Sequence, residues 1–192
     1  MTEISPSRNI NLKDAIDKND LKAKIIDAGP VVNIWPKNDK IDKVYNDLKA
    51  VSNVTGHFQV YLKNDIPEEW YYKNHYRIPP ILVVADPGWM ILQPYKPLFP
   101  NLKGYHGYDP SFKDMKGIFF ASGPAIKKNT VVSPVHIVDV YQLMCHILQI
   151  TPAPNNGTWS TITNVLRETS SASRSDISVS MFIALFLICI LE

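Results

Sequence analysis

Cysteine is scarce in this sequence of 192 residues, and so is net charge. Of the two cysteines, Cys145 lies in an apolar helical pattern, where we expect it to be buried, and Cys189 lies in an apolar tail; these contexts do not favour a mutual disulfide. The net charge is +2, and lysines are scattered among aspartates, which gives no sign of a nucleic-acid surface. The composition, 45% hydrophobic and 20% charged, indicates one globular domain or one large piece of a bigger one.

The N-terminus also lacks the features of a secretion signal, because residues 1–8 contain neither a basic region nor an apolar one. The C-terminus looks like a membrane anchor: residues 167–180 form a Ser-rich polar spacer, and residues 181–192 form an apolar tail too short to cross a bilayer. A glycosylphosphatidylinositol signal, a truncated transmembrane helix and a buried terminal helix all remain open for this tail. Because an anchor presupposes secretion, we expect that sequence preceding Met1 is missing here.

Two triplets fit the acceptor pattern for N-glycosylation. They begin at Asn53 (Asn-Val-Thr) and at Asn156 (Asn-Gly-Thr). Together with the apolar tail, they predict that the complete protein lies on the extracellular face of the cell membrane.

Hydrophobic patterns predict alternating strands and helices, which favour the α/β class. We predict helices at residues 40–51, 135–150 and 159–166, and strands at residues 31–35, 57–62, 81–85 and 117–121. Residues 81–85 are apolar without a break, which is typical of a strand buried on both faces. Residues 88–92 are predicted to form its hairpin partner.

The clearest candidate site is residues 104–109, Gly-Tyr-His-Gly-Tyr-Asp. Glycines on both sides of His106 let the backbone pass close to a ligand, because no Cβ intervenes. A histidine on such a loop suits a metal ligand or a proton carrier. A polar turn in which His106 bonds a backbone carbonyl is the alternative.

Several segments resemble a known family in order and spacing. They are residues 104–109, 118–124 (Ile-Phe-Phe-Ala-Ser-Gly-Pro), 138–145 (Val-Asp-Val-Tyr-Gln-Leu-Met-Cys) and 152–158 (Pro-Ala-Pro-Asn-Asn-Gly-Thr). They resemble the ectonucleotide pyrophosphatase/phosphodiesterase family, the type I phosphodiesterases of the alkaline phosphatase superfamily. Residues 1–12 resemble the segment that directly follows the family's Asp-His-Gly metal motif. The resemblance covers residues 1–166, and the spacer and tail resemble those of the smaller membrane-anchored members.

The resemblance implies a fold and a reaction. The expected fold is the C-terminal portion of an alkaline-phosphatase-like α/β sandwich around a mainly parallel sheet, in which residues 81–85 and 118–121 would lack a neighbouring strand on one side. The implied reaction is hydrolysis of phosphodiester or pyrophosphate bonds in nucleotides, or of choline-phosphate esters in lipids, with two zinc ions and a threonine nucleophile.

The resemblance carries few site residues onto this chain. Among the zinc ligands only His106 has a counterpart here, and no catalytic residue does. Asp109 is a candidate to orient His106 through a hydrogen bond, and a conformational role in the loop is the alternative. One departure from the family pattern is Pro110, at a position where the family commonly has Asn. Proline lacks both the amide side chain and the backbone N–H that Asn would supply.

Other candidates have a structural alternative beside the functional one. We expect His136 and His146 to be capping or surface residues. The aromatic side chains of a loop are candidates to stack on a nucleotide base, with ordinary loop packing as the alternative: Tyr71, Tyr72, His75 and Tyr76.

Two functions follow. The first is the C-terminal fragment of a zinc-dependent nucleotide pyrophosphatase/phosphodiesterase, inactive alone, which takes a nucleotide or another small phosphodiester in the complete enzyme and does not bind a nucleic-acid duplex. The second is a non-catalytic truncated isoform or pseudoenzyme that acts as an anchored interaction fragment.

Overall fold

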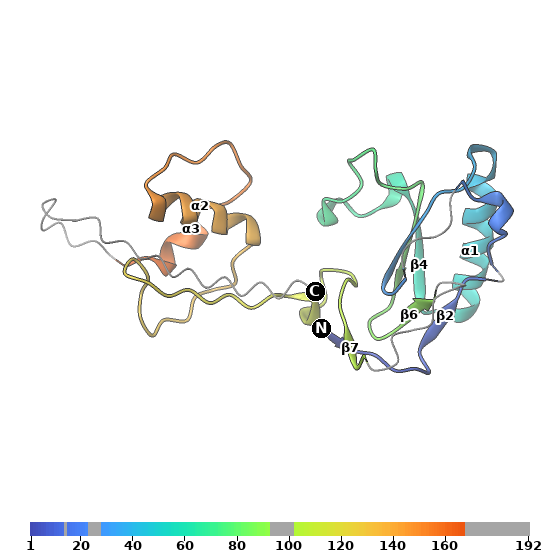
Figure 1. The fold of residues 1–192 in the computed structure, drawn as a ribbon, viewed down its shortest axis with the longest axis horizontal. Coiled ribbons are helices and arrows are strands. Elements are labelled where there is room, and N and C mark those ends of the chain that lie inside the picture. Colours follow the sequence, from blue (N-terminus) through green and yellow to red (C-terminus); the bar gives the residue numbers. More distant parts are fainter. Residues whose placement is uncertain (14, 23–27, 93–101, 168–192) are drawn as a thin grey trace, which may run out of the picture. The chain divides into compact units, whose positions relative to one another are not determined.

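The computed structural model describes residues 1–13, 15–22, 28–92 and 102–167. They divide into two compact units: unit 1, Met1–Gly117, and unit 2, which begins at Ile118 (Figure 1). The tail at residues 181–192, with Cys189, lies outside the described residues. In the described part of the chain, no helix has both the length and the apolar character that a bilayer crossing requires.

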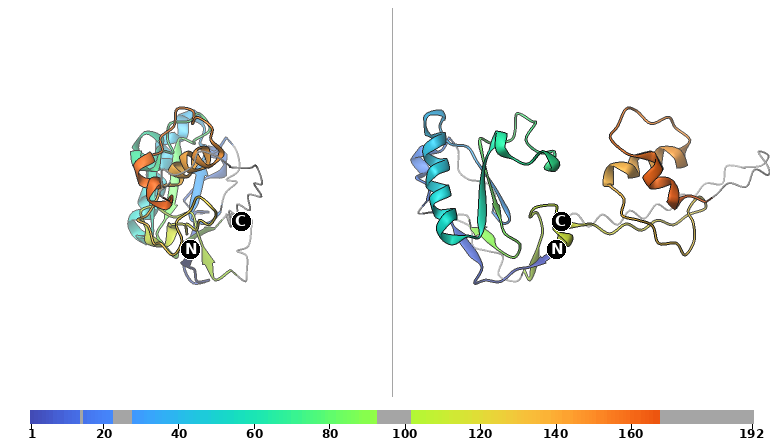
Figure 2. Two further views of the ribbon diagram at one scale, coloured as in Figure 1. Left: turned by 90° about the vertical axis from the view of Figure 1, so that its left-hand side faces the viewer. Right: turned by 180° about the vertical axis from the view of Figure 1, so that it is seen from behind.

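Unit 1 is built on a three-stranded sheet in the order β3 (Val31–Ile34), β5 (Ile81–Ala85), β4 (Phe58–Leu62). Helix α1 (Ile41–Thr55) lies along one face of it (Figures 1 and 2). The helix ends where Gly56 adopts φ 72°, and Ser52 at its end is buried and donates its hydroxyl hydrogen to the Phe58 carbonyl. These strands and this helix confirm the predictions from hydrophobic pattern.

The central strand β5 is buried at all five residues, as its unbroken apolar sequence predicts. Ile81, Val83 and Ala85 belong to the apolar cluster that includes α1. Leu82 and Val84 belong to a second cluster, completed by Ile66 with Trp70 and Ile78 at its edge. Each face of the strand therefore has its own core.

The pairing of the strands differs from the prediction in two respects. Strand β5 is antiparallel to both neighbours, so the expectation that residues 81–85 lack a neighbour on one side is wrong. Strand β6 (Met90–Leu92) is not its hairpin partner, because β3 and β4 already occupy both edges of β5. Instead β6 pairs in parallel with β2 (Asn9–Asn11). The other pairs of described strands are antiparallel.

Short elements complete the chain. Strand β1 (Thr2–Glu3) pairs antiparallel with β7 (Gly104–Tyr105). The 3-10 helices are Lys18–Asp20, Asn38–Lys40, Lys63–Asp65, Glu68–Trp70, Lys113–Met115 and Thr163–Val165.

Unit 2 contains α2 (Ile137–Leu148) and α3 (Trp159–Ile162), both at predicted positions. Its core is small: Ile126, Leu143, Ile162 and Val165. Asp139 is almost fully buried, where its carboxylate accepts the backbone N–H groups of His136 at 3.0 Å and Thr158 at 2.7 Å. One side chain therefore caps α2 and ties the loop before α3 to it.

The prediction of a strand at residues 117–121 is wrong, because these residues form neither strand nor helix. Ile118 is 83% exposed and Phe120 is 86% exposed. The described part of unit 2 contains no strand with which they could pair, only an isolated bridge between Ile126 and Leu166. An apolar pattern cannot become a sheet strand without a partner strand.

Candidate functional site

The His106 loop starts from the paired strands β1 and β7. Thr2 lies opposite Tyr105, and Glu3 lies opposite Gly104. A Cβ at Gly104 would lie 3.4 Å from the Thr2 carbonyl oxygen, which is an ordinary contact distance, so this pairing does not itself require glycine there. Continued by one residue, the same register places Met1 opposite His106. The pairing itself ends at Thr2 and Tyr105, and the Met1 ammonium donates to the Asp114 carbonyl.

Tyr108 fastens the loop to the core of unit 1. It is only 3% exposed, and its hydroxyl donates to the Trp89 carbonyl at 3.0 Å. Burial raises the pKa of Tyr108 to about 12. Gly107, at φ 101°, makes the turn that lets His106 face outward and Tyr108 inward.

Asp109 shapes the turn that follows. Its carboxylate oxygen Oδ1 accepts the Ser111 backbone N–H at 2.8 Å, and its carbonyl accepts the Phe112 N–H at 3.2 Å. Pro110 lies within the turn, and its carbonyl accepts a hydrogen bond from the Lys116 ammonium at 2.6 Å. These contacts favour the conformational role of Asp109; its role in orienting the His106 ring stays a prediction.

His106 itself is exposed, with its ring stacked near that of Tyr105 at 5.6 Å between centroids. No group of three or more His, Cys, Asp or Glu side chains capable of holding a metal occurs among the described residues. The role of His106 as a metal ligand stays a prediction.

The other histidines have local contacts. His136 is the N-cap residue of α2, and His146 packs its ring near Trp159 at 5.0 Å, in keeping with capping and surface roles. His75 Nδ1 accepts the Arg77 backbone N–H at 3.1 Å. His57 stacks on Trp89 with centroids 3.7 Å apart, a contact that sequence reasoning missed because the two residues lie far apart in the sequence.

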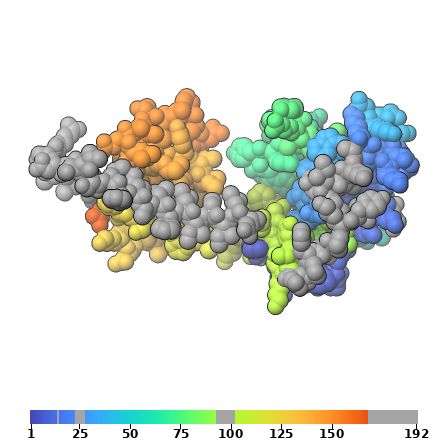
Figure 3. All heavy atoms as spheres, viewed as in Figure 1, coloured from blue at the N-terminus to red at the C-terminus, as the bar shows by residue number. Residues whose placement is uncertain are grey.

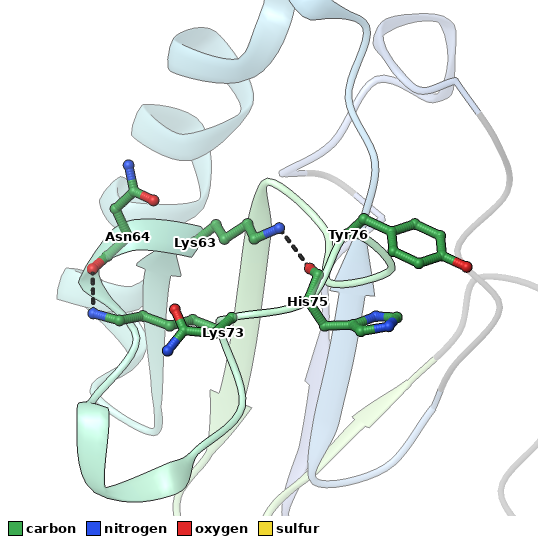
Figure 4. Close-up of a pocket in the computed structure, with 6 residues that line it drawn as sticks. Lys63, Asn64, Lys73, His75 and Tyr76 are labelled. Atoms are coloured by element: carbon green, nitrogen blue, oxygen red, sulfur yellow. Dashed lines mark hydrogen bonds between the residues drawn. The ribbon is translucent and has the colours of Figure 1, made fainter.

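A shallow hollow of about 500 Å³ opens in the loop after β4 (Figure 4). It is lined by Lys63, Asn64, Lys73, Asn74, His75 and Tyr76. Its lysines tie the loop together: the Lys63 ammonium donates to the His75 carbonyl at 2.7 Å, and that of Lys73 donates to the Asn64 carbonyl at 3.0 Å (Figure 4).

The aromatic residues of this loop are exposed to different degrees. Tyr71 and Tyr76 are largely exposed, whereas the Tyr72 hydroxyl donates to the Asn33 side chain at 3.2 Å. Stacking of a nucleotide base on this loop stays a prediction.

Both candidate glycosylation residues are exposed. Asn53 lies in the last turns of α1, and Asn156 lies in the loop between α2 and α3. Glycosylation of either stays a prediction.

Cys145, by contrast, is buried as expected, and it is a free thiol.

Comparison with known proteins places these features in a family. The family model described as type I phosphodiesterase / nucleotide pyrophosphatase matches residues 1–109. Human ectonucleotide pyrophosphatase/phosphodiesterase family member 5 is 42% identical over 166 residues, which are 86% of this chain and 33% of that protein. Human bis(5'-adenosyl)-triphosphatase ENPP4 is 44% identical over 159 residues, which are 83% of this chain and 33% of that protein. The chain thus spans about a third of the length of these relatives.

Solved structures agree. The human family member 5 structure matches with a TM-score of 0.77 and 41% identity, and the match covers 85% of this chain and 42% of that one. A murine family member 5 structure, of an inactive variant in complex with AMP, matches with a TM-score of 0.78 and 39% identity, over 86% and 42% of the two chains. The fold is therefore α/β of the alkaline-phosphatase-like type, as the sequence predicts. The family model, the relatives and the solved structures agree that this chain belongs to the type I phosphodiesterase / nucleotide pyrophosphatase family.

Proposed function

We propose that this chain supplies the C-terminal part of the catalytic domain of a zinc-dependent phosphodiesterase that hydrolyses pyrophosphate or phosphodiester bonds in nucleotides. A nucleotide substrate is favoured over a choline-phosphate lipid by two relatives: one is named as a bis(5'-adenosyl)-triphosphatase, and another was solved with AMP. In this proposal His106 is a zinc ligand and the chain contains no nucleophile.

The pairing of β1 with β7 is the observation that carries the proposal. It aligns the start of the chain with His106, so polypeptide joined to Met1 along the same strand would run past this histidine. The sequence resemblance places the family's Asp-His pair in that position. Register and resemblance are thus two separate arguments for further ligands beside His106.

The His106 loop suits a metal ligand in its chemistry and its support. A neutral imidazole nitrogen is a preferred zinc donor, and the loop is fixed on both sides, by β7 before it and by buried Tyr108 after it. When bound, zinc polarises phosphate oxygens and stabilises the alkoxide of a hydroxyl nucleophile. The residues of this chain would position one ligand nitrogen and hold it still.

The proposal is tested by grafting. Residues 1–166 replace the matching segment of the human bis(5'-adenosyl)-triphosphatase relative, and hydrolysis of its dinucleotide substrate and bound zinc are measured. We expect turnover by the graft. His106→Ala should lower it on the order of 100-fold or more and should reduce the bound zinc.

His136→Ala is the matched control, because His136 is the N-cap residue of α2 and the resemblance carries no metal-ligand role onto it. It should leave both zinc content and turnover unchanged. A His106→Ala graft that keeps full activity and full zinc would contradict the assignment. A folded wild-type graft without turnover would favour the alternative function, a non-catalytic interaction fragment.

We propose, further, that the complete protein lies on the extracellular face of the membrane, held by the apolar tail. Asn53 and Asn156 are both exposed, as an acceptor asparagine must be, so both could carry a glycan in the secretory pathway. Release of the protein from the surface of expressing cells by phosphatidylinositol-specific phospholipase C would distinguish a lipid anchor from a transmembrane helix.

A further inference from the structure

The loop after β4, residues 63–78, is fixed in place by packing and by backbone contacts. At its start, the Lys63 backbone N–H donates to the Pro80 carbonyl at 2.9 Å. In its middle, Ile66 is 1% exposed and packs against β5, with Trp70 at the edge of the same cluster. The loop lies at the surface of unit 1, where Figure 3 shows it in green. Its polar side chains are therefore presented from a fixed backbone, which lowers the entropic cost of binding a ligand.

The two lysines that line the hollow in this loop are both half-buried. Lys63 and Lys73 each donate one ammonium hydrogen to a backbone carbonyl of the loop, at 2.7 Å and at 3.0 Å (Figure 4). An ammonium group carries three N–H donors. These bonds therefore hold both positive charges in place and leave further donors for a ligand.

The positive charges are not balanced within the lining of the hollow. Its lining residues include two lysines and neither Asp nor Glu. Lys73 pairs with Glu68 at 2.8 Å, but Glu68 is not one of the lining residues. Among the described residues, no carboxylate forms an ion pair with Lys63. A half-buried ammonium group without a carboxylate partner favours a bound anion, which would supply the missing charge.

The other lining residues add neutral donors and one aromatic ring. His75 Nδ1 accepts the Arg77 backbone N–H at 3.1 Å, so the neutral ring carries its hydrogen on Nε2 and donates from there. Asn64 and Asn74 are exposed and add amide N–H groups. The ring of Tyr76 is exposed beside them, with the Arg77 guanidinium 5.4 Å from its centre.

The size of the hollow narrows the kind of anion. Its volume of about 500 Å³ lies in the range of small-molecule sites and exceeds the needs of a bare phosphate ion. We propose that this hollow binds the phosphate monoester of a small molecule, with the Lys63 ammonium as the principal charge. The oxygens of a phosphate monoester accept charge-assisted hydrogen bonds from ammonium groups and weaker ones from amides and imidazole. This inference rests on contacts within unit 1, and it does not depend on zinc, on turnover or on the proposed function.

The hollow and the His106 loop lie at opposite ends of strand β5 (Figure 1). The loop of the hollow begins beside Pro80, which directly precedes β5. At the other end, the Ala85 N–H donates to the Pro30 carbonyl at 2.7 Å, and a Cβ at Gly107 would lie 3.8 Å from the Pro30 side chain. Five strand residues, each about 3.3 Å long, separate the two ends. Substitutions in the hollow therefore leave the His106 loop untouched.

The test is a titration of the full 192-residue chain, isotope-labelled, with AMP, inorganic phosphate and adenosine at constant ionic strength. Backbone amide shifts are followed by NMR. We expect AMP and phosphate to shift the amides of residues 63–77 until they saturate, and adenosine to leave them unchanged.

Two variants change the charge of the hollow. Asn74→Asp places a carboxylate of the same shape among the lining residues, and it should weaken the binding of AMP about fivefold or more. Lys63→Gln should weaken it to a similar degree, since its amide can still donate to the His75 carbonyl but carries no charge.

Each variant has a matched control elsewhere on unit 1. Asn46→Asp makes the same change at an exposed position of α1, and Lys18→Gln does so in the exposed 3-10 helix Lys18–Asp20. Neither should alter the affinity for AMP. Unchanged amide shifts in Ile81–Ala85 show that each variant keeps the fold of unit 1.

The outcomes separate the sources of the anion. Tighter binding of AMP than of phosphate supports the proposal and shows that the hollow also contacts the nucleoside, whereas equal affinities support it and assign the phosphate group alone. Absence of saturable shifts with both anions overturns it, as does an Asn74→Asp variant that binds AMP as the wild type does. Shifts that Lys18→Gln reduces as much as Lys63→Gln, or adenosine that binds as tightly as AMP, overturn it as well.

Discussion

At the scale of single residues, Tyr108 makes the stability of unit 1 sensitive to alkaline pH. Its pKa is raised to about 12 by burial, so the folded state favours the neutral phenol. The contribution of Tyr108 to the free energy of unfolding is fully present below the ordinary tyrosine pKa of about 10 and is lost as the pH rises toward 12. The total loss amounts to about 3 kcal/mol.

Urea unfolding at pH 8 and at pH 11 tests this. At pH 8 Tyr108→Phe should be about 1 kcal/mol less stable than the wild type, since it loses the hydrogen bond to the Trp89 carbonyl. At pH 11 the difference should shrink or reverse. An equal difference at both pH values would show that Tyr108 does not titrate as its burial requires.

The two glycosylation candidates also differ at this scale. Asn156 lies in a loop, whereas the triplet of Asn53 ends within α1, where the Thr55 hydroxyl donates to the Val51 carbonyl at 3.0 Å. We expect Asn156 to be modified more completely in a secreted form of the protein. Asn156→Gln should remove most of the mobility shift that a glycan causes on gels, and Asn53→Gln should change it little. The reverse pattern would contradict this expectation.

At the scale of elements, the loop between α2 and α3 is held by contacts that leave no room at Gly157. A Cβ there would lie 2.6 Å from the Val138 carbonyl oxygen and 3.0 Å from the Asn155 side-chain oxygen. Gly157→Ala should therefore displace the loop and weaken its bonds to Gln142 and Asp139, at a cost of about 1–3 kcal/mol.

The matched control is Gly117→Ala, since a Cβ at Gly117 meets nothing within 4 Å. Thermal unfolding followed by circular dichroism compares the two variants. Equal melting temperatures would mean that the loop around Gly157 adapts without strain.

The elements also show how far the sequence could predict the fold. Strands β3, β4 and β5 and helices α1 and α2 follow from local apolar periodicity, which a sequence displays directly. The partner of β6 could not be predicted, because β2 lies about eighty residues earlier and nothing local marks the pair. Residues 118–121 have a strand pattern, but a pattern does not supply the neighbour that a strand requires.

The same limit applies to the candidate site. The glycines around His106 predicted the loop and its candidate ligand. The inward turn of Tyr108, the hydrogen bond from the Ser111 N–H to Asp109 and the stack of His57 on Trp89 depend on packing and needed the structure.

At the scale of the whole molecule, we expect the 192-residue chain alone to be inactive. No group of three or more potential metal ligands occurs among the described residues, and zinc centres need three or four. Hydrolysis of bis-p-nitrophenyl phosphate by the purified chain should not exceed that of buffer containing zinc. Turnover that a chelator abolishes would show that the chain has a complete site of its own.

The pairing of Thr2 with Tyr105 has a consequence for the time course of folding. The two residues are separated by almost the whole of unit 1, so the loop that joins them carries a large closure entropy, and contacts of such high sequence separation form slowly. During synthesis, β1 leaves the ribosome before β7 and must wait for about a hundred residues before its partner strand exists. The three-stranded sheet, whose strands lie between them, can assemble earlier. The strand pair that positions His106 is therefore expected to be among the last parts of unit 1 to form.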